Sequence, residues 1–373
     1  MRMSDTAFHI RPEAAGFDPY VPGLSVAEVR ERFGLSTIIK MASNENPLGI
    51  SPEALEAVRR CAGFGFRYPR EGNPDLVAAL AAHHGLPEDC FVPGNGSDEV
   101  IDLLLRVCPV PGRHNVVASR PSFSMYRVLS RLCGVEFRSV PLKEDFSFDL
   151  PGLAAAADDD TALLFLTVPD NPSGACPPRA DVETLARRLP PACLLVLDEA
   201  YIDFCLDPEE QSFLPLLNDY GNVAVLRTFS KTYGLAGLRL GCGILPPALA
   251  AVLRAVHMPF SVNIAAEAAG IAALDDREFY EETRRVVAEG RALLHEELSV
   301  LGFIVYPSQA NFLMFRPGAA HTLSAVELFE GLLARGVIIR RLASYGLEEH
   351  LRVSVGTARE NREFLRCVRE LCA

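Results

Sequence analysis

What the sequence lacks sets the first limits on this protein. No apolar run in its 373 residues reaches the ~20 residues that span a membrane. The N-terminal segment, MRMSDTAFHIRPEA, has no apolar core of a signal peptide. None of the ten cysteines has CxxC spacing, and the eight histidines show no metal-like spacing. We therefore expect a cytoplasmic protein with reduced cysteines and no bound metal.

Positive charge is also scarce. The chain carries 36 Lys and Arg against 48 Asp and Glu, a formal net charge of −12. An acidic chain repels nucleic acid and anionic membrane surfaces, so we expect neither as a partner. A local cluster of arginines can still bind small anions. The hydrophobic fraction of 49% is ordinary for a globular protein, and the length favours about two domains.

Short apolar runs alternate with helical patterns along the middle of the chain. Runs unbroken by polar residues lie at 115–119, 162–168, 193–200 and 222–230. Such runs are typical of strands buried on both faces of a parallel sheet. Helix-start signals lie at Ser51-Pro52-Glu53 and at Asn73-Pro74-Asp75, each with a candidate N-cap followed by proline. We predict an α/β fold with a mostly parallel central sheet covered by helices.

The two ends of the chain differ from this middle. Residues 1–45 are mixed and rich in proline, and we predict an N-terminal arm that joins a small domain. Residues 46–260 would form the large domain. The stretch from about 246 to 300 is helical, and strand-like text then returns as FIVYP, NFLMFR, GVIIR and LRVSVG. We predict that residues 261–373 form a smaller C-terminal α/β domain.

Four motifs lie where predicted strands end. They are Asp170-Asn171-Pro172-Ser173-Gly174, Asp198-Glu199-Ala200-Tyr201, Ser230-Lys231 and Gly237-Leu238-Arg239. Ligands bind outside the carboxyl ends of strands in open α/β sheets. Each motif alone has an ordinary explanation: an NPxG segment is usually a turn, a carboxylate is often a cap or a metal ligand, and a Ser-Lys pair is usually solvated. Their order and common placement instead indicate a single site.

The residue types in these motifs match the chemical needs of pyridoxal phosphate (PLP). The cofactor aldehyde needs a lysine amine, which Lys231 offers. A buried Asp198 would keep the pyridine nitrogen protonated, since an opposite charge favours the charged form, and the protonated ring then acts as an electron sink. Asn171 and Tyr201 can form hydrogen bonds with the phenolic oxygen of the cofactor.

The cofactor phosphate needs hydrogen-bond donors. Gly96 and Ser97 lie at a predicted helix N-terminus, where free N–H groups and the helix dipole favour an anion. Ser230 and Arg239 would complete the phosphate site. Asp98 is placed in the same set, although helix capping alone accounts for it. Phe123 follows another predicted strand end and is a candidate to stack on the ring, although core packing explains it equally well.

With these residues assembled, the chain resembles the fold-type I aminotransferases and, within them, the histidinol-phosphate aminotransferases. The resemblance runs nearly end to end. It rests on Tyr20-Val21-Pro22-Gly23, SNENPLG at 43–49, Tyr68-Pro69, GNGSDE at 94–99, NPSG at 171–174, DEAY at 198–201, RTFSK at 227–231, AGLRLG at 236–241, PFSVN at 259–263, ANF at 310–312 and LRVSVG at 351–356. The chain has PDNPSG where PNNPTG is commoner, but Asn171 keeps its place.

The resemblance implies roles for individual residues. Lys231 would be the Schiff-base lysine and the general base that moves a proton between the substrate carbon and the cofactor carbon. Asp198 would pair with the pyridine nitrogen, and Asn171 and Tyr201 would contact the phenolic oxygen. Phe123 would take the ring-stacking place, where close relatives often carry Tyr. The family is homodimeric with shared active sites, which implies that Tyr68 of the partner subunit lies near the cofactor phosphate.

Substrate recognition would fall to Tyr20, Asn44, Arg340 and Arg352. Two guanidiniums can clamp the carboxylate of glutamate or the phosphate of histidinol phosphate. Whether Arg340 or Arg341 faces the substrate stays open, because a solvated pair at a strand end explains both. The resemblance implies PLP-dependent transfer of an amino group between a small-molecule amino donor, L-histidinol phosphate, and a 2-oxo acid, 2-oxoglutarate, in histidine biosynthesis.

Other functions fit parts of the same pattern. A threonine-phosphate decarboxylase would use the same lysine, aspartate and arginines but would break a carbon–carboxylate bond. An aromatic-amino-acid aminotransferase of the same fold has much the same motifs. Release of carbon dioxide from threonine phosphate, or activity with phenylpyruvate, would identify either one. A PLP-binding transcriptional regulator is disfavoured, because only about 45 residues precede SNENPLG and the chain is acidic.

Overall fold

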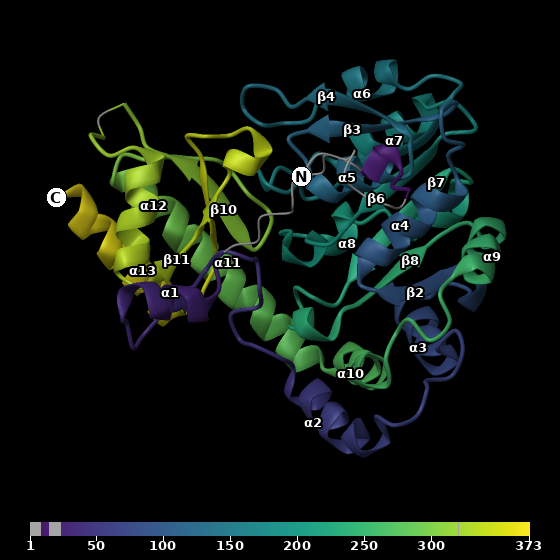
Figure 1. Ribbon diagram of the computed structural model, residues 1–373, viewed down its shortest axis with the longest axis horizontal. Coiled ribbons are helices and arrows are strands. Elements are labelled where there is room, and N and C mark those ends of the chain that lie inside the picture. The colour runs from purple at the N-terminus through teal and green to yellow at the C-terminus, as the bar shows by residue number, and fades with distance from the viewer. Residues whose placement is uncertain (1–8, 15–23, 320) are drawn as a thin grey trace.

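A seven-stranded sheet forms the centre of the larger part of the computed structural model, which describes residues 9–14, 24–319 and 321–373 (Figure 1). Its strands are β2 (Phe91–Asn95), β3 (Asn115–Arg120), β4 (Glu136–Pro141), β5 (Thr161–Thr167), β6 (Leu194–Asp198), β7 (Val223–Thr228) and β8 (Leu240–Ile244). They lie in the order β2-β8-β7-β6-β5-β3-β4. Strands β7 to β4 pair in parallel, whereas β8 is antiparallel to both β7 and β2. The prediction of a mostly parallel sheet is confirmed, with β8 reversed.

The central strands are buried on both faces. Along β5, Leu164 and Leu166 pack in one apolar cluster, while Leu163 and Phe165 pack in the other. Successive side chains of a strand point to opposite faces, so an unbroken apolar run supplies both clusters at once. Strands β6 and β7 show the same division. These are the strands whose carboxyl ends carry three of the four sequence motifs.

Helices cover both faces of this sheet (Figure 1). The helices of this larger part are α2 (Pro52–Cys61), α3 (Pro74–His84), α4 (Ser97–Val107), α5 (Ser124–Leu132), α6 (Leu150–Ala156), α7 (Arg179–Arg188), α8 (Pro208–Gln211), α9 (Pro247–Val256) and α10 (Ile264–Asp275). Helices α4, α5 and α9 contribute to one cluster, and α3, α6, α7 and α10 contribute to the other. Ser51 caps α2 as predicted. Asn73 precedes α3 and Pro74 opens it, as predicted, but Asn73 is left-handed and its side chain donates to Val262 and Glu267 rather than capping the helix.

Three strands of the large sheet escape the sequence analysis. Strand β2 contains Pro93 and Gly94, and β8 contains Gly241 and Gly243. Proline and glycine normally weaken a strand assignment. Strand β4 has a mixed, partly exposed pattern, because it is the last strand of the sheet and pairs on one side only, with β3.

A smaller antiparallel sheet lies in the C-terminal part of the chain. Its order is β12-β13-β10-β9, formed by β9 (Ile304–Val305), β10 (Phe312–Arg316), β12 (Arg340–Arg341) and β13 (Leu351–Ser354). Helices α11 (Arg277–Val300), α12 (Ala325–Ala334) and α13 (Ala358–Cys372) pack with it around one apolar cluster. The GVIIR segment is divided between β11 (Val337–Ile338) and β12. Helix α11 runs from the larger part into the smaller one (Figure 1).

Residues 24–40 of the N-terminal segment pack on the smaller part, whereas Pro12–Ala14 contacts α5 of the larger part. Strand β1 (Ile39–Lys40) pairs in parallel with β11, and α1 (Val26–Phe33) places Val29 against Leu333 and Ile338. Helix α10, which follows residue 260, instead packs in the larger part through Ala266 and its neighbours. The predicted division at 1–45, 46–260 and 261–373 stays a prediction. Within the described ranges, no helix is both long enough and apolar enough to cross a membrane.

Candidate active site

A cavity of about 570 Å³ opens at the carboxyl ends of β5, β6 and β7. Its volume lies within the range of roughly 300–1,000 Å³ that is typical of small-molecule sites. Nine of the residues singled out from the sequence line it: Ser97, Asp98, Phe123, Asn171, Asp198, Tyr201, Ser230, Lys231 and Arg239. The parallel strands end at one edge of the sheet, which explains why motifs far apart in sequence meet here.

A buried carboxylate forms one side of the cavity. Asp198 ends β6 and is only 4% exposed. Its Oδ2 accepts a hydrogen bond of 2.7 Å from the phenol of Tyr126, and its Oδ1 accepts one from the backbone N–H of Ala200. Burial raises the pKa of Asp198 to about 6, and the Tyr126 hydrogen bond opposes that rise. A cationic group bound beside Asp198 would stabilise its charged form.

The amine of Lys231 lies in the same cavity. Lys231 follows β7, and its Nζ donates to the carbonyl of Ser43 at 3.4 Å. Burial, together with the nearby positive charges of Arg352 and Arg239, lowers the pKa of Lys231 to about 8. Far more of this amine is therefore neutral near physiological pH than of an ordinary lysine. Only the neutral amine is a nucleophile.

A chain of hydrogen bonds links the phenol of Tyr201 to the smaller part of the protein. The Tyr201 hydroxyl accepts from Nδ2 of Asn44 at 3.1 Å and from Nδ2 of Asn171 at 3.5 Å. Nη1 of Arg352 donates to Oδ1 of Asn171, and the Oγ of Ser354 donates to Oδ1 of Asn44. Burial raises the pKa of Tyr201 well above its usual value, so its hydroxyl keeps its proton.

The opposite end of the cavity holds the N-terminus of α4. Gly96 precedes this helix with φ 79° and ψ 164°, a backbone conformation that is essentially restricted to glycine. A Cβ added at Gly96 would lie 2.7 Å from Nη2 of Arg239, so only glycine leaves the guanidinium its place. Arg239 also pairs with Asp98 at 3.1 Å. Ser230 is buried and lines the same end.

Phe123, the candidate for stacking on the cofactor ring, lies against Tyr126, which donates a hydrogen bond to Asp198. Phe123 lines the cavity and packs edge-on against Tyr126, with ring centroids 5.6 Å apart. It is also part of the apolar cluster beneath. Phe123 therefore takes part in core packing, and because it also lines the cavity its stacking on a cofactor ring stays a prediction.

The remaining predicted residues that the structure describes lie outside the cavity wall. Arg352 is 6% exposed and contacts Asn171, and Arg340 is its cross-strand partner on β12. Arg341 pairs loosely with Glu348 at 3.8 Å. Tyr68 is 81% exposed and stacks on Phe260, with ring centroids 4.7 Å apart. Tyr20 lies outside the described residues.

Several residues of the site were not predicted from the sequence. Tyr126 on α5 and Thr167 at the end of β5 share a 2.7 Å hydrogen bond beside Asp198. Ser43 and Glu45, within SNENPLG, also line the cavity. The position of Tyr126 one turn into the helix after Phe123 is a weak signal, because any helical residue at that spacing could equally face the core.

The donor set of this cavity fits PLP. It combines a lysine amine, a buried carboxylate, a protonated phenol beside an amide, and a helix N-terminus with a serine and an arginine. These groups correspond to the aldehyde, pyridine nitrogen, phenolic oxygen and phosphate of the cofactor. The space that Gly96 leaves for Arg239 supports the same assignment, since that space would be filled by any side chain.

Comparison with known proteins also relates this chain to PLP-dependent aminotransferases. Residues 36–368 match the family model described as aminotransferase class I and II. The chain is 56% identical to a histidinol-phosphate aminotransferase of Nitratidesulfovibrio vulgaris, covering 97% of this chain and 96% of that protein. It is also 56% identical to the protein of that name from Oleidesulfovibrio alaskensis, covering 97% of this chain and 94% of that one. The crystal structure of histidinol-phosphate aminotransferase from Sinorhizobium meliloti in complex with pyridoxal-5'-phosphate has a TM-score of 0.86 at 29% identity, covering 96% of this chain and 98% of the other.

Proposed function

Because this chain belongs to the class I and II aminotransferase family, we propose that it uses PLP to transfer an amino group between L-histidinol phosphate and 2-oxoglutarate. The observation that carries this proposal is the single cavity that joins Lys231, Asp198 and Tyr201. The substrate is supported by the 56% identity to relatives that bear the name histidinol-phosphate aminotransferase. The products are imidazole-acetol phosphate and L-glutamate, which places the reaction in histidine biosynthesis.

Each cavity residue has a proposed role toward the cofactor. The amine of Lys231 binds the aldehyde, Asp198 faces the pyridine nitrogen, and Asn171 and Tyr201 face the phenolic oxygen. Phe123 covers the ring. The phosphate is held by Gly96, Ser97, Ser230 and Arg239, with Asp98 as the counterion of Arg239. When bound, PLP supplies an electron-withdrawing ring that stabilises negative charge at the substrate carbon.

The protein's own part in the reaction is proton transfer and orientation. Nζ of Lys231, with a pKa lowered to about 8, accepts the proton from the substrate carbon and returns it later. Tyr201 remains a hydrogen-bond donor, because its pKa lies well above neutral pH. The buried carboxylate of Asp198 would stabilise a positive charge on the pyridine nitrogen of the cofactor.

Arg352 is the proposed anchor for the acidic group of each substrate. Nη1 of Arg352 binds Asn171 and Nη2 binds the carbonyl of Ala42, while its buried Nε has no hydrogen-bond partner among the described residues. A guanidinium with a free donor can take a carboxylate or a phosphate oxygen. Arg340 on the neighbouring strand and Asn44 would complete the substrate site. Tyr20 is proposed on the family resemblance alone.

A homodimer with shared active sites is part of the proposal. Tyr68 would then contact the cofactor phosphate bound in the other subunit. In support, Phe260 stacks on Tyr68, and exposed apolar side chains lie within a few residues of these two in sequence, namely Phe64, Phe66 and Met258. Exposed apolar patches of this kind mark interaction surfaces. We also propose the division into an arm, a large and a small domain, and the cytoplasmic location stays a prediction.

A half-reaction tests the proposed function. L-Histidinol phosphate alone is added to the purified, PLP-loaded protein while the cofactor absorbance is followed. We expect conversion to the pyridoxamine form and its reversal by 2-oxoglutarate, and no conversion in Lys231→Ala. Failure with histidinol phosphate, combined with reaction of phenylalanine or release of carbon dioxide from threonine phosphate, would contradict the substrate assignment and leave the cofactor assignment standing.

A further inference from the structure

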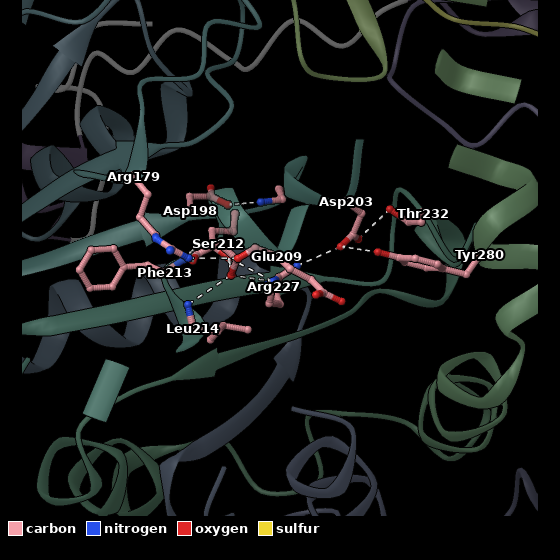
Figure 2. Close-up of polar contacts among 12 residues, drawn as sticks. Arg179, Asp198, Asp203, Glu209, Ser212, Phe213, Leu214, Arg227, Thr232 and Tyr280 are labelled. Atoms are coloured by element: carbon pink, nitrogen blue, oxygen red, sulfur yellow. Dashed lines mark hydrogen bonds and ion pairs between the residues drawn. The ribbon is translucent and has the colours of Figure 1, made fainter. Parts of the chain in front are cut away.

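A largely buried polar network connects the two segments that carry the catalytic residues of the proposed reaction (Figure 2). It is formed by Glu199 and Asp203 on one segment and by Arg227 and Thr232 on the other. None of these four residues lines the cavity. Their chain neighbours do: Asp198 precedes Glu199, Thr228 follows Arg227, and Lys231 precedes Thr232.

The carboxylate of Asp203 is the centre of this network. Its Oδ1 accepts from Nη1 of Arg227 at 3.0 Å and from the hydroxyl of Tyr280 at 3.3 Å. Its Oδ2 accepts from Oγ1 of Thr232 at 2.8 Å. The backbone carbonyl of Asp203 accepts from Nε of Arg284 at 2.9 Å. Asp203, which lies in the segment that follows β6, therefore joins this segment both to the segment that carries Lys231 and to α11.

Arg227 fixes the chain on the N-terminal side of Lys231. Its Nη2 lies 3.2 Å from Oε2 of Glu199 and donates to Oγ of Ser212 at 3.1 Å. The Glu199 side chain is 2% exposed and also accepts from Ser212 and from the backbone N–H of Phe213. Figure 2 shows Arg227 between Ser212 on one side and Asp203 on the other. The side chains of Arg227 and Asp203 are only 15% and 16% exposed, and ionic groups with several partners move little, because a displacement leaves a charge poorly paired.

Thr232 fixes the chain on the C-terminal side of Lys231. It is fully buried. Its hydroxyl binds Asp203, and its carbonyl accepts from Nδ2 of Asn46 at 2.7 Å. Asn46 also donates to Thr283 on α11. Both the side chain and the backbone of the residue after Lys231 are thus held by groups outside the cavity.

We propose that Asp203 is a positioning residue, which sets the place of the Lys231 amine relative to Asp198 by holding Arg227 and Thr232 on either side of it. This inference rests on the proposed role of Lys231. Asp203 itself touches neither the substrate nor the cofactor. Proton transfer by Lys231 requires its Nζ within hydrogen-bond reach of the reacting carbon, and a displacement of about 1 Å can cost roughly 100-fold in rate.

The test uses the full chain with single substitutions in this network. Thr232→Val removes the hydroxyl and keeps the shape, Thr232→Ser keeps the hydroxyl, and Asp203→Asn removes the charge. Thr161→Val is the matched control, because Thr161 is also a buried threonine with a side-chain hydrogen bond, to Asn115 at 2.8 Å, at the far end of β5. Thermal unfolding of each variant identifies any general loss of stability.

The first readout is the reactivity of Lys231 in the cofactor-free protein. The chain contains three lysines, Lys40, Lys143 and Lys231, so reductive methylation with formaldehyde can be followed for each by peptide mass spectrometry. Exposed Lys143 is the internal reference. We expect Thr232→Val and Asp203→Asn to change the pH midpoint of Lys231 labelling by about half a unit or more relative to the unmodified protein. Lys143 should stay unchanged in every variant.

The second readout is whether a substitution changes kcat or KM in the PLP-loaded protein. We expect kcat to fall about tenfold in Thr232→Val and Asp203→Asn, with KM changed less than about twofold, since the substrate anchor is intact. Thr232→Ser should restore both readouts, and Thr161→Val should alter only stability. Unchanged Lys231 labelling and unchanged kcat in folded Thr232→Val would overturn the proposal. The labelling readout needs no substrate, so it decides the positioning role even where the proposed reaction fails.

Discussion

The phenol of Tyr126 donates a 2.7 Å hydrogen bond to Oδ2 of Asp198, and the hydroxyl of Thr167 lies 2.7 Å from the same phenol oxygen. Tyr126 comes from the helix after β3, whereas Thr167 and Asp198 end two adjacent strands. The bond supports the charged form of a carboxylate that burial pushes toward the neutral form. The hydrogen bond from Tyr126 therefore stabilises the negative charge of Asp198 even when no cationic group is bound beside it.

Tyr126→Phe should weaken PLP binding. Loss of the donor raises the pKa of Asp198 further above its present value of about 6, so less of the carboxylate is charged at neutral pH. A hydrogen bond to a charged group contributes about 1.5–3 kcal/mol, which corresponds to roughly a tenfold or larger rise in the Kd of PLP. Absorbance titration of the cofactor-free protein measures this. Tyr220→Phe, which removes a surface phenol bonded to Arg187, should leave the Kd unchanged.

Uptake of PLP should depend on pH through Lys231. Its pKa is lowered from 10.5 to about 8, so the neutral, reactive amine forms as pH rises toward 8. At pH 7 roughly one-tenth of the amine is neutral, far more than for an ordinary lysine. The rate of uptake should rise with pH, reach half its maximum near the pKa of about 8 and level off above about pH 9. Stopped-flow absorbance from pH 6 to 10 checks this, and a rate still rising steeply at pH 9.5 would contradict the lowered pKa.

Gly96→Ala should impair both stability and cofactor binding. Its φ and ψ of 79° and 164° cost an alanine about 1–3 kcal/mol, and the added Cβ would lie 2.7 Å from Nη2 of Arg239. The displaced guanidinium should raise the Kd of PLP as well. Gly237→Ala is the matched control, because nothing lies within 4 Å of a Cβ there. Urea unfolding and PLP titration of both variants measure the two effects, and equal behaviour of the two variants would refute the steric argument.

The sequence predicts those parts of the fold and site that depend on local pattern. Apolar runs identify β5, β6 and β7, and the motifs at their ends supply most of the cavity wall. Strands β2 and β8 escape because Pro93 and Gly241 stand where a strand pattern expects apolar residues. In β8 glycine is needed for packing, since a Cβ at Gly243 would meet Val100 of α4 at 2.7 Å.

The contacts that sequence cannot predict join residues far apart along the chain. Tyr126 meets Asp198 across 72 positions, and Asn44 meets Ser354 across 310. These pairs depend on how α5 lies on the sheet and on how the N-terminal segment crosses the smaller part. Neither is encoded in a local motif. The network around Asp203 is of the same kind, because Thr232 and Tyr280 of α11 meet at Asp203 only through tertiary packing.

Arg352→Lys should raise the KM of both substrates. The lysine keeps the charge, but it lacks the planar fork that binds Asn171 and Ala42 and leaves Nε free. We expect the KM for glutamate and for L-histidinol phosphate to rise about 10-fold or more, since charged hydrogen bonds of this kind contribute about 1.5–3 kcal/mol. Steady-state kinetics with each substrate measures the change. Arg341→Lys is the control: Arg341 pairs only loosely with Glu348, so its KM values should stay close to those of the unmodified protein. An equal rise in both variants would show that Arg341 shares the anchoring role, whereas a rise for one substrate alone would show that the two substrates bind their acidic groups at different arginines.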